Sequence, residues 1–177
     1  MKSKKLINAS KAPVDPRGWI VVKKVTNGRG LIAARQFRTN QLISEIEGRV
    51  VTAEEVWSYW NTDPRLGANC IRYDADNFLN PDGFIGAFAN HSCNPNTGLV
   101  KRGRKLIIKA IVPIAAGDEL THDYSTFIGA DDVWTMRCNC GEENCRGIVR
   151  NIKKLPKATL ARYRKLGIVP DFILDTF

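Results

Sequence analysis

The chain has 177 residues, a formal net charge of +9, 44% hydrophobic residues and five cysteines. This length allows one domain with a substantial core, and no apolar run approaches the roughly 18 residues that a membrane-spanning helix needs. The basic N-terminus lacks the apolar segment of a secretory signal, so an intracellular protein is expected, cytoplasmic or, in a eukaryote, nuclear and chromatin-associated.

The charge is unevenly distributed along the chain. Residues 45–82 hold eight acidic residues against three arginines, a net charge of −5, whereas residues 137–165 hold nine basic residues against two acidic ones, a net charge of +7. The acidic block favours a basic partner. The basic segment would allow nucleic-acid binding, although a solvated basic helix explains it more simply.

The predicted elements are mostly short strands separated by glycine turns, after a basic N-terminal arm over residues 1–18. Strands are expected at 19–25, 42–46, 49–51 and 106–110, with turns at 27–30, 102–104 and 116–118. Thr52 and Glu55 form a capping box that starts a short helix running to about Trp60. A basic helix over 157–166 ends before Gly167 and Pro170. This pattern favours a mostly β, α+β fold over a parallel α/β fold.

Two polar segments about thirty residues apart are not explained by packing. The first is Asn90-His91-Ser92-Cys93-Asn94-Pro95-Asn96, which follows the apolar run 84–89, and the second is Glu119-Leu120-Thr121-His122-Asp123-Tyr124. Turn chemistry explains the Asn-Pro-Asn end of the first segment but not the Asn-His-Ser-Cys before it.

A cysteine cluster, Cys138-x-Cys140-x4-Cys145, follows directly. Its spacing indicates metal-ligating thiolates rather than a disulfide framework. Zinc takes four ligands, so a fourth must come from elsewhere, and Cys70 and Cys93 are the candidates. From the residues alone, an iron–sulfur or redox role for these cysteines stays open.

Together, the three segments resemble the SET family of protein-lysine methyltransferases, from about Trp19 to Val149. The resemblance implies several small β-sheets with a knot-like C-terminal crossing. It also implies a SET domain over 19–128 with an insert at about 52–82, a zinc-binding post-SET segment over 129–150, and a C-terminal helical tail over 151–177.

The resemblance also assigns a cofactor site for S-adenosylmethionine. Gly28-Arg29-Gly30, which alone would be only a turn, matches the loop whose backbone contacts the methionine end. Asn90 would hydrogen-bond the amino-acid end, the His91 backbone would meet the adenine edge, and Val149 would pack against adenine. Glycine suits such a loop because no Cβ separates the backbone from a ligand.

Tyr124 matches the catalytic tyrosine, which also borders the cofactor. His122 occupies the position where phenylalanine or tyrosine commonly controls how many methyl groups are added. Cys93 would complete a structural zinc site with Cys138, Cys140 and Cys145, which leaves Cys70 as a buried apolar residue.

Three further positions depart from the family pattern. Ile46 replaces a tyrosine of the lysine channel, and Ala87 replaces an arginine. Another channel tyrosine falls near Asn69, with Tyr73 as a possible substitute nearby.

The resulting hypothesis is a lysine methyltransferase that acts on a lysine-rich protein, such as a histone or a DNA-packing protein, with the acidic block as the wall of the substrate groove. Nucleic acid would be contacted only indirectly, through the substrate. Two alternatives are a SET-like module that binds without effective catalysis, and a zinc-stabilised basic nucleic-acid-binding domain.

Overall fold

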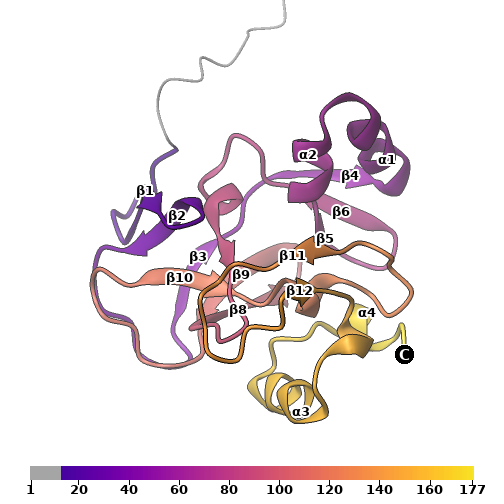
Figure 1. The fold of residues 1–177 in the computed structure, drawn as a ribbon. Helices are drawn as coiled ribbons and strands as arrows, with labels where there is room; N and C mark the ends of the chain where they lie inside the picture. The colour runs from indigo at the N-terminus through magenta and orange to yellow at the C-terminus, as the bar shows by residue number, and fades with distance from the viewer. Residues whose placement is uncertain (1–12) are drawn as a thin grey trace, which may run out of the picture.

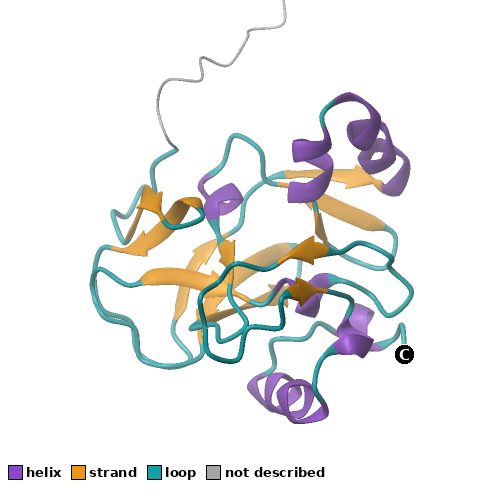
Figure 2. Ribbon diagram, viewed as in Figure 1, coloured by secondary structure: helices purple, strands orange, loops and turns teal. Residues whose placement is uncertain are grey.

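The computed structural model describes residues 13–177, so most of the expected N-terminal arm lies outside the described residues. Within that range the chain forms twelve short strands in four small sheets, with few and short helices (Figures 1 and 2). The expected mostly β, α+β fold is therefore confirmed. No helix between residues 13 and 177 is long and apolar enough to cross a membrane.

One sheet brings the two polar segments together. It has the order β1-β2-β10-β7, where β1 is Ile20–Val25, β2 is Gly28–Ala33, β10 is Glu119–His122 and β7 is Asn90–His91. β7 lies parallel to β10, with Asn90 opposite Thr121 and His91 opposite His122. Hydrogen bonding between strands thus places the two sequence motifs side by side.

The turn expected at 27–30 lies earlier than predicted. Thr26 and Asn27 make the two-residue turn, because Val25 already pairs with Gly28 across the β1–β2 hairpin. Gly28 has a φ of 93°, a left-handed conformation that favours glycine. Gly28, Arg29 and Gly30 consequently belong to a strand, and their backbone groups lie at its start.

The central sheet has the order β3-β9-β8, with β3 at Leu42–Glu45, β9 at Lys105–Ala110 and β8 at Thr97–Arg102. Its inward side chains, including Ile43, Leu99 and Ile108, are fully buried in the main core. The hairpin turn at Gly103 confirms the expected reversal, whereas most of β8 was not predicted.

A third sheet carries two short helices. Its order is β4-β6-β5, with β4 at Arg49–Thr52, β6 at Asn77–Asn80 and β5 at Ile71–Arg72. Helix α1 spans Ala53–Thr62 and α2 spans Pro64–Asn69. The capping box is confirmed, because the Thr52 side chain accepts from the Glu55 N–H and the Glu55 side chain accepts from the Thr52 N–H.

After β10 the chain forms β11 (Met136–Arg137), which pairs with β12 (Ile148–Val149), and then helices α3 (Lys157–Leu166) and α4 (Asp171–Leu174). These two helices lie on the side of the molecule away from α1 and α2 (Figure 1). Short 3-10 turns lie at Ile85–Phe88, Tyr124–Phe127 and Ile152–Lys154. Helix α3 has the predicted bounds and ends at Gly167, whose φ is 63°.

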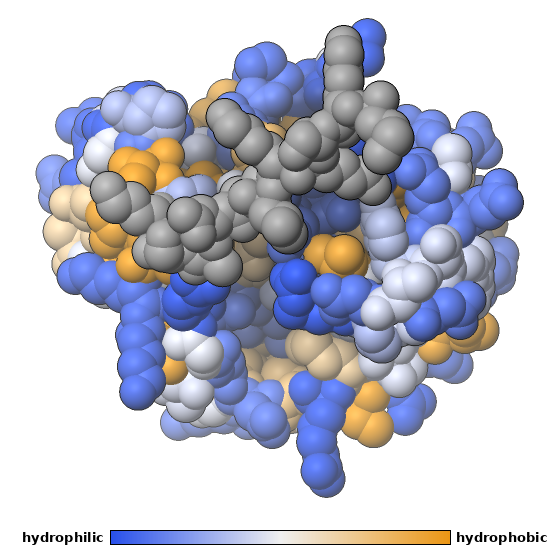
Figure 3. Space-filling model, turned by 90° about the horizontal axis from the view of Figure 1, so that it is seen from above, coloured by the Kyte–Doolittle hydropathy of each residue, from blue (hydrophilic) through white to orange (hydrophobic). Residues whose placement is uncertain are grey.

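The tail is docked against the sheet. A Cβ on Gly98 of β8 would lie 2.4 Å from a side-chain carbon of Ile168, so the Ile168 side chain packs directly on the backbone of the sheet. Ile168 and Ile173 are buried in a second cluster that also includes Ile111, next to the end of β9. On the face shown in Figure 3, by contrast, hydrophilic residues predominate and apolar ones form separate patches.

Candidate active site and metal centre

Tyr124 follows β10 and is held at three points. Its hydroxyl donates to the Ala89 carbonyl oxygen at 2.9 Å, and its backbone N–H donates to His91 Nδ1 at 3.2 Å. Its ring lies 4.9 Å from the His122 ring, centroid to centroid. Burial and the charge of Glu119 raise the pKa of Tyr124, so the phenol stays protonated at neutral pH. The hydroxyl proton is donated to the Ala89 carbonyl oxygen, so the lone pairs of the hydroxyl oxygen can accept further hydrogen bonds.

Both histidines of the site are neutral at physiological pH. Burial, helped by neighbouring His91, lowers the pKa of His122 to about 3. Burial lowers the pKa of His91 to about 4. Because His91 Nδ1 accepts a hydrogen bond, its proton must sit on Nε2, which faces Cys93 Sγ at 3.4 Å. His91 therefore links the Tyr124 backbone to the cysteine cluster.

Asn90, Glu119 and Gly30 come together at the start of β2 and form a small polar site, called the cradle below. The Asn90 amide nitrogen donates to the Arg29 carbonyl oxygen at 3.1 Å and to Glu119 Oε1 at 2.8 Å. A Cβ on Gly30 would lie 2.3 Å from Glu119 Oε1 and 3.0 Å from Asn90 Nδ2, so a larger residue there would displace these two side chains. The neighbouring Asn27 side chain donates to the Asn139 carbonyl oxygen at 3.2 Å, which ties this hairpin to the cysteine segment.

A groove of about 620 Å³ leads to Tyr124 and His122. This volume is in the range of pockets that hold a drug-sized ligand, which is more than one lysine side chain needs. One wall comes from the third sheet and its helices, and includes Val56, Trp57, Trp60, Asn69 and Phe78. The other wall contains Val133 and Trp134.

The two walls touch across the groove and carry exposed apolar side chains. Arg72 of β5 pairs with Asp132 at 3.0 Å. At the rim, Trp57 is 66% exposed and Val133 is 86% exposed. Large apolar side chains that face solvent around a groove are typical of protein-binding sites.

The acidic block contributes little to this groove. Of its eight acidic residues only Asp76 lines the groove. Others are engaged elsewhere: Glu55 caps α1 and pairs with Arg49, and Asp82 pairs with Arg65. The groove wall was expected to be acidic, but it is mainly apolar.

The structure also places the positions that depart from the family pattern. Asn69 and Ala87 line the groove, whereas Ile46 is buried against Gly86. Tyr73 lies outside the groove, because its ring is in the core and its hydroxyl donates to the Arg104 carbonyl oxygen at 2.6 Å. Tyr73 is therefore not a substitute channel residue, and Tyr124 is the only tyrosine that lines the groove within residues 13–177.

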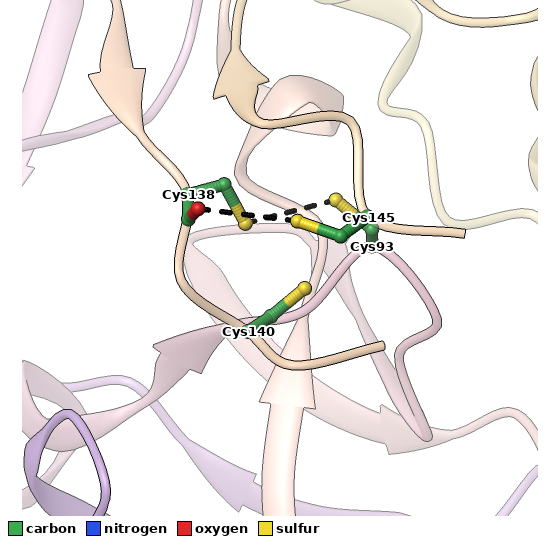
Figure 4. Close-up of side chains that lie close together, drawn as sticks. All are labelled: Cys93, Cys138, Cys140 and Cys145. Carbon is green, nitrogen blue, oxygen red and sulfur yellow. Dashed lines mark hydrogen bonds between the residues drawn. The ribbon is translucent and has the colours of Figure 1, made fainter. Parts of the chain in front are cut away.

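The four cysteines Cys93, Cys138, Cys140 and Cys145 come together in space, with their sulfur atoms within 4.8 Å of one another (Figure 4). Four thiolates around one tetrahedral zinc, at about 2.3 Å each, would lie about 3.8 Å apart. The Cys93 and Cys138 sulfur atoms are 3.8 Å apart. The donor set and its spacing therefore fit a zinc ion.

Backbone N–H groups around the cluster stabilise thiolates and oppose the effect of burial, which raises the pKa of Cys93 and Cys138. The Arg146 N–H points to Cys93 Sγ at 3.4 Å, and the Gly147 N–H points to Cys145 Sγ at 3.5 Å. Burial acts to raise the pKa of Cys140, but hydrogen bonds from backbone N–H groups and neighbouring thiols lower it to about 7. Such outer contacts orient metal ligands and tune their basicity.

Cys70 is not part of the cluster. It lines the groove, its thiol donates to the Leu66 carbonyl oxygen at 3.3 Å, and burial raises its pKa to about 11. Val149 is fully buried among Cys93, Cys138 and Ile128, opposite Met136 in the β11–β12 pair. The role of Val149 beside adenine stays a prediction.

The comparisons with known proteins agree with this geometry. The SET domain family model matches residues 28–125. The chain is 35% identical over 127 residues to the Drosophila melanogaster "Histone-lysine N-methyltransferase trr". This alignment covers 67% of this chain and 5% of that protein. It is 31% identical over 159 residues to a Coccidioides immitis "Histone-lysine N-methyltransferase, H3 lysine-36 specific". That alignment covers 78% of this chain and 14% of that protein.

Among solved structures, the methyltransferase domain of human histone-lysine N-methyltransferase SETMAR superimposes with a TM-score of 0.61 and 25% identity, over 73% of this chain and 57% of that one. The small β-sheets, the groove that ends at Tyr124 and the cysteine cluster are consistent with a SET-type protein. This chain belongs to the SET domain family. It spans only a small part of the length of the curated relatives named here.

Two contributors to the site were missed from the sequence. The Ala89 carbonyl oxygen fixes the Tyr124 hydroxyl, and Glu119 holds Asn90. Glu119 is the first residue of the second polar segment, residues 119–124, so the sequence could have indicated its role. A backbone carbonyl has no sequence signal of its own.

Proposed function

We propose that this chain transfers a methyl group from S-adenosylmethionine to the side-chain amine of a lysine in a basic protein. The observation that carries the proposal is the Tyr124 hydroxyl, fixed by Ala89 at the inner end of a groove. Ala89 directly precedes Asn90, so the groove and the cradle of Asn90, Gly30 and Glu119 adjoin one another.

The residues of the cradle suit the cofactor's amino-acid end. Both donors of the Asn90 amide are engaged, so its oxygen is left to accept from an ammonium group. The backbone of Gly28, Arg29 and Gly30 would approach the same end, and His91 and Val149 are the proposed adenine neighbours. When bound, S-adenosylmethionine supplies an electrophilic methyl group, which requires a neutral amine as nucleophile.

The groove can favour that neutral amine without a strong base. Deprotonating a free lysine near neutral pH costs about 4 kcal/mol. Apolar walls lower this cost because burial disfavours the ammonium form. His122 is neutral and the Tyr124 oxygen has free lone pairs, so both can accept a hydrogen bond from the amine. The main contribution of these side chains is alignment.

The four cysteines are proposed to hold one structural zinc ion. Cys93 follows β7, whereas Cys138, Cys140 and Cys145 lie near β11 and β12. A metal there would fasten the post-SET segment, proposed as residues 129–150, to the SET domain, proposed as residues 19–128 with its insert at about 52–82. Residues 151–177 would be the C-terminal tail.

The proposed substrate is a lysine-rich protein such as a histone or a DNA-packing protein, which would make the site of action intracellular. The relatives described above are histone-lysine N-methyltransferases, which supports this class. The apolar rim further favours a substrate that offers apolar contacts beside the target lysine, since Trp57 and Val133 are exposed there.

The test is transfer of labelled methyl from S-adenosylmethionine to a panel of lysine-rich proteins. Tyr124→Phe should lower kcat by about a hundredfold or more, since orientation of the nucleophile is lost, while the cofactor dissociation constant changes little. Label on lysine with wild type alone supports the proposal. Equal turnover by the variant would remove Tyr124 from the reaction, and cofactor binding without transfer to any protein would favour a non-catalytic SET-like module.

A further inference from the structure

A buried carboxylate lies in the sequence between two residues of the inner end of the groove. Asp123 has a side chain with no solvent exposure, and it separates His122 from Tyr124 in the chain. Its Oδ2 accepts from Arg146 Nη1 at 2.6 Å and from the Tyr163 hydroxyl at 3.1 Å. Its Oδ1 accepts from Arg146 Nη2 at 2.7 Å and from the Ser125 N–H at 3.0 Å.

This single carboxylate joins three segments that are far apart in sequence. Arg146 directly follows Cys145 of the metal cluster, and its bidentate contact neutralises Asp123. Tyr163 comes from helix α3 of the tail and is fully buried. Burial and the charge of Asp123 raise the pKa of Tyr163, so its hydroxyl remains a donor.

The four donors saturate the carboxylate. An ionised carboxylate has about four lone-pair sites, and each site of Asp123 is occupied. A buried network that is fully satisfied is rigid, whereas one missing partner leaves an unpaired charged oxygen in a low-dielectric setting. Because Asp123 shares its backbone with His122 and Tyr124, a shift of this carboxylate moves both groove residues.

We propose that Tyr163 is a positioning residue of the active site, acting through Asp123, so that the tail helix α3 helps to fix His122 and Tyr124 in the groove. The kinetic part of this inference rests on the proposed methyl transfer, whereas the structural part does not. Helix α3 thus has two different faces: a basic one toward solvent and a buried one that holds the Asp123 carboxylate.

The test compares Tyr163→Phe with wild type by steady-state kinetics and by hydrogen exchange. We expect kcat to fall about tenfold while KM for the protein substrate stays within about twofold, since the groove walls are unchanged and alignment is lost. Hydrogen exchange should rise over residues 119–127 and 145–149, the two segments joined by Asp123.

Tyr73→Phe is the matched control. Tyr73 is also buried and also loses one hydroxyl hydrogen bond, to the Arg104 carbonyl oxygen, but it lies outside the groove. Both variants should lower Tm, Tyr163→Phe by more because its lost partner is a buried charged carboxylate, and only Tyr163→Phe should lower kcat and loosen residues 119–127. Identical behaviour of the two variants would overturn the inference.

A double-mutant cycle with Asp123→Ala, which removes the acceptor of the Tyr163 hydroxyl, tests the route of the effect. If Tyr163 acts through Asp123, adding Tyr163→Phe to Asp123→Ala should change neither kcat nor exchange further. Additive effects would contradict the inference. If wild type transfers no methyl group at all, the proposed function fails, and the exchange comparison between Tyr163→Phe and Tyr73→Phe still decides the positioning role.

Discussion

At the residue scale, Gly30 shows how tightly the cradle is built. A methyl group on its Cα would lie 2.3 Å from Glu119 Oε1 and 3.0 Å from Asn90 Nδ2, so Glu119 and Asn90 would have to move. Gly30→Ala should therefore weaken S-adenosylmethionine binding by about tenfold or more, in line with an overpacking cost of about 1–3 kcal/mol. Titration calorimetry with the cofactor measures the change.

Gly103→Ala is the control for that prediction. Gly103 has a φ of 56° and no atom lies within 4 Å of its added Cβ, so the substitution costs backbone strain without touching the cradle. It should lower stability by about 1–2 kcal/mol and leave cofactor affinity unchanged. An unchanged dissociation constant in Gly30→Ala would mean that the cofactor does not use this cradle.

At the element scale, helix α1 presents Trp57 at the rim of the groove. Exposed tryptophans at binding sites often carry about 2 kcal/mol or more of the binding free energy. Trp57→Ala should raise KM for a basic protein substrate by about tenfold or more with little change in kcat. The control is Val50→Ala in β4, an exposed apolar residue that does not line the groove, which should leave KM unchanged.

How far the elements could be predicted depends on whether their signals are local. The capping box of Thr52 and Glu55 and the glycine end of α3 act within one turn of helix, and both were predicted with the correct start or end. Strand β6 and most of β8 have weak local patterns, because their positions are set by the strands beside them.

The site shows the same division between local and long-range signals. The motifs around Asn90, Tyr124 and Cys138 could be recognised because their residue types are unusual for packing. The apolar nature of the groove wall could not be predicted, since it depends on which acidic residues turn toward Arg49 or Arg65 instead. The contact of Tyr163 with Asp123 joins residues forty positions apart and leaves no local pattern.

At the scale of the whole molecule, the cysteine cluster connects the strand β7 to the segment around β11 and β12. Wild type should bind about one zinc ion per chain. Cys140→Ser should abolish this tight binding, because only three thiolates remain. It should also increase hydrogen exchange over residues 136–150. Metal analysis and hydrogen-exchange mass spectrometry measure both effects. Cys70→Ser is the control, and it should bind zinc like wild type because Cys70 lies outside the cluster.

The stability of the whole fold should depend on pH through His122. Its pKa is lowered by burial from about 6.5 in the unfolded chain to about 3 in the folded one. Between these values the unfolded chain binds a proton that the folded chain does not, so the free energy of unfolding falls as pH falls. The resulting loss in the free energy of unfolding is absent above about pH 6.5 and grows by about 1.4 kcal/mol for each pH unit below it.

His122→Phe isolates this contribution, because phenylalanine keeps an aromatic ring beside Tyr124 without a titratable group. Urea unfolding of wild type and variant at several values between pH 7.5 and pH 5 measures the difference in their free energies of unfolding. All other titrating groups are common to both proteins, so the difference should shift in favour of the variant only below about pH 6.5. A difference that is constant with pH would mean that His122 takes up a proton in the folded protein as readily as in the unfolded one. In that case the imidazole would be charged within the groove below pH 6.5 and would repel the lysine ammonium that has to enter it.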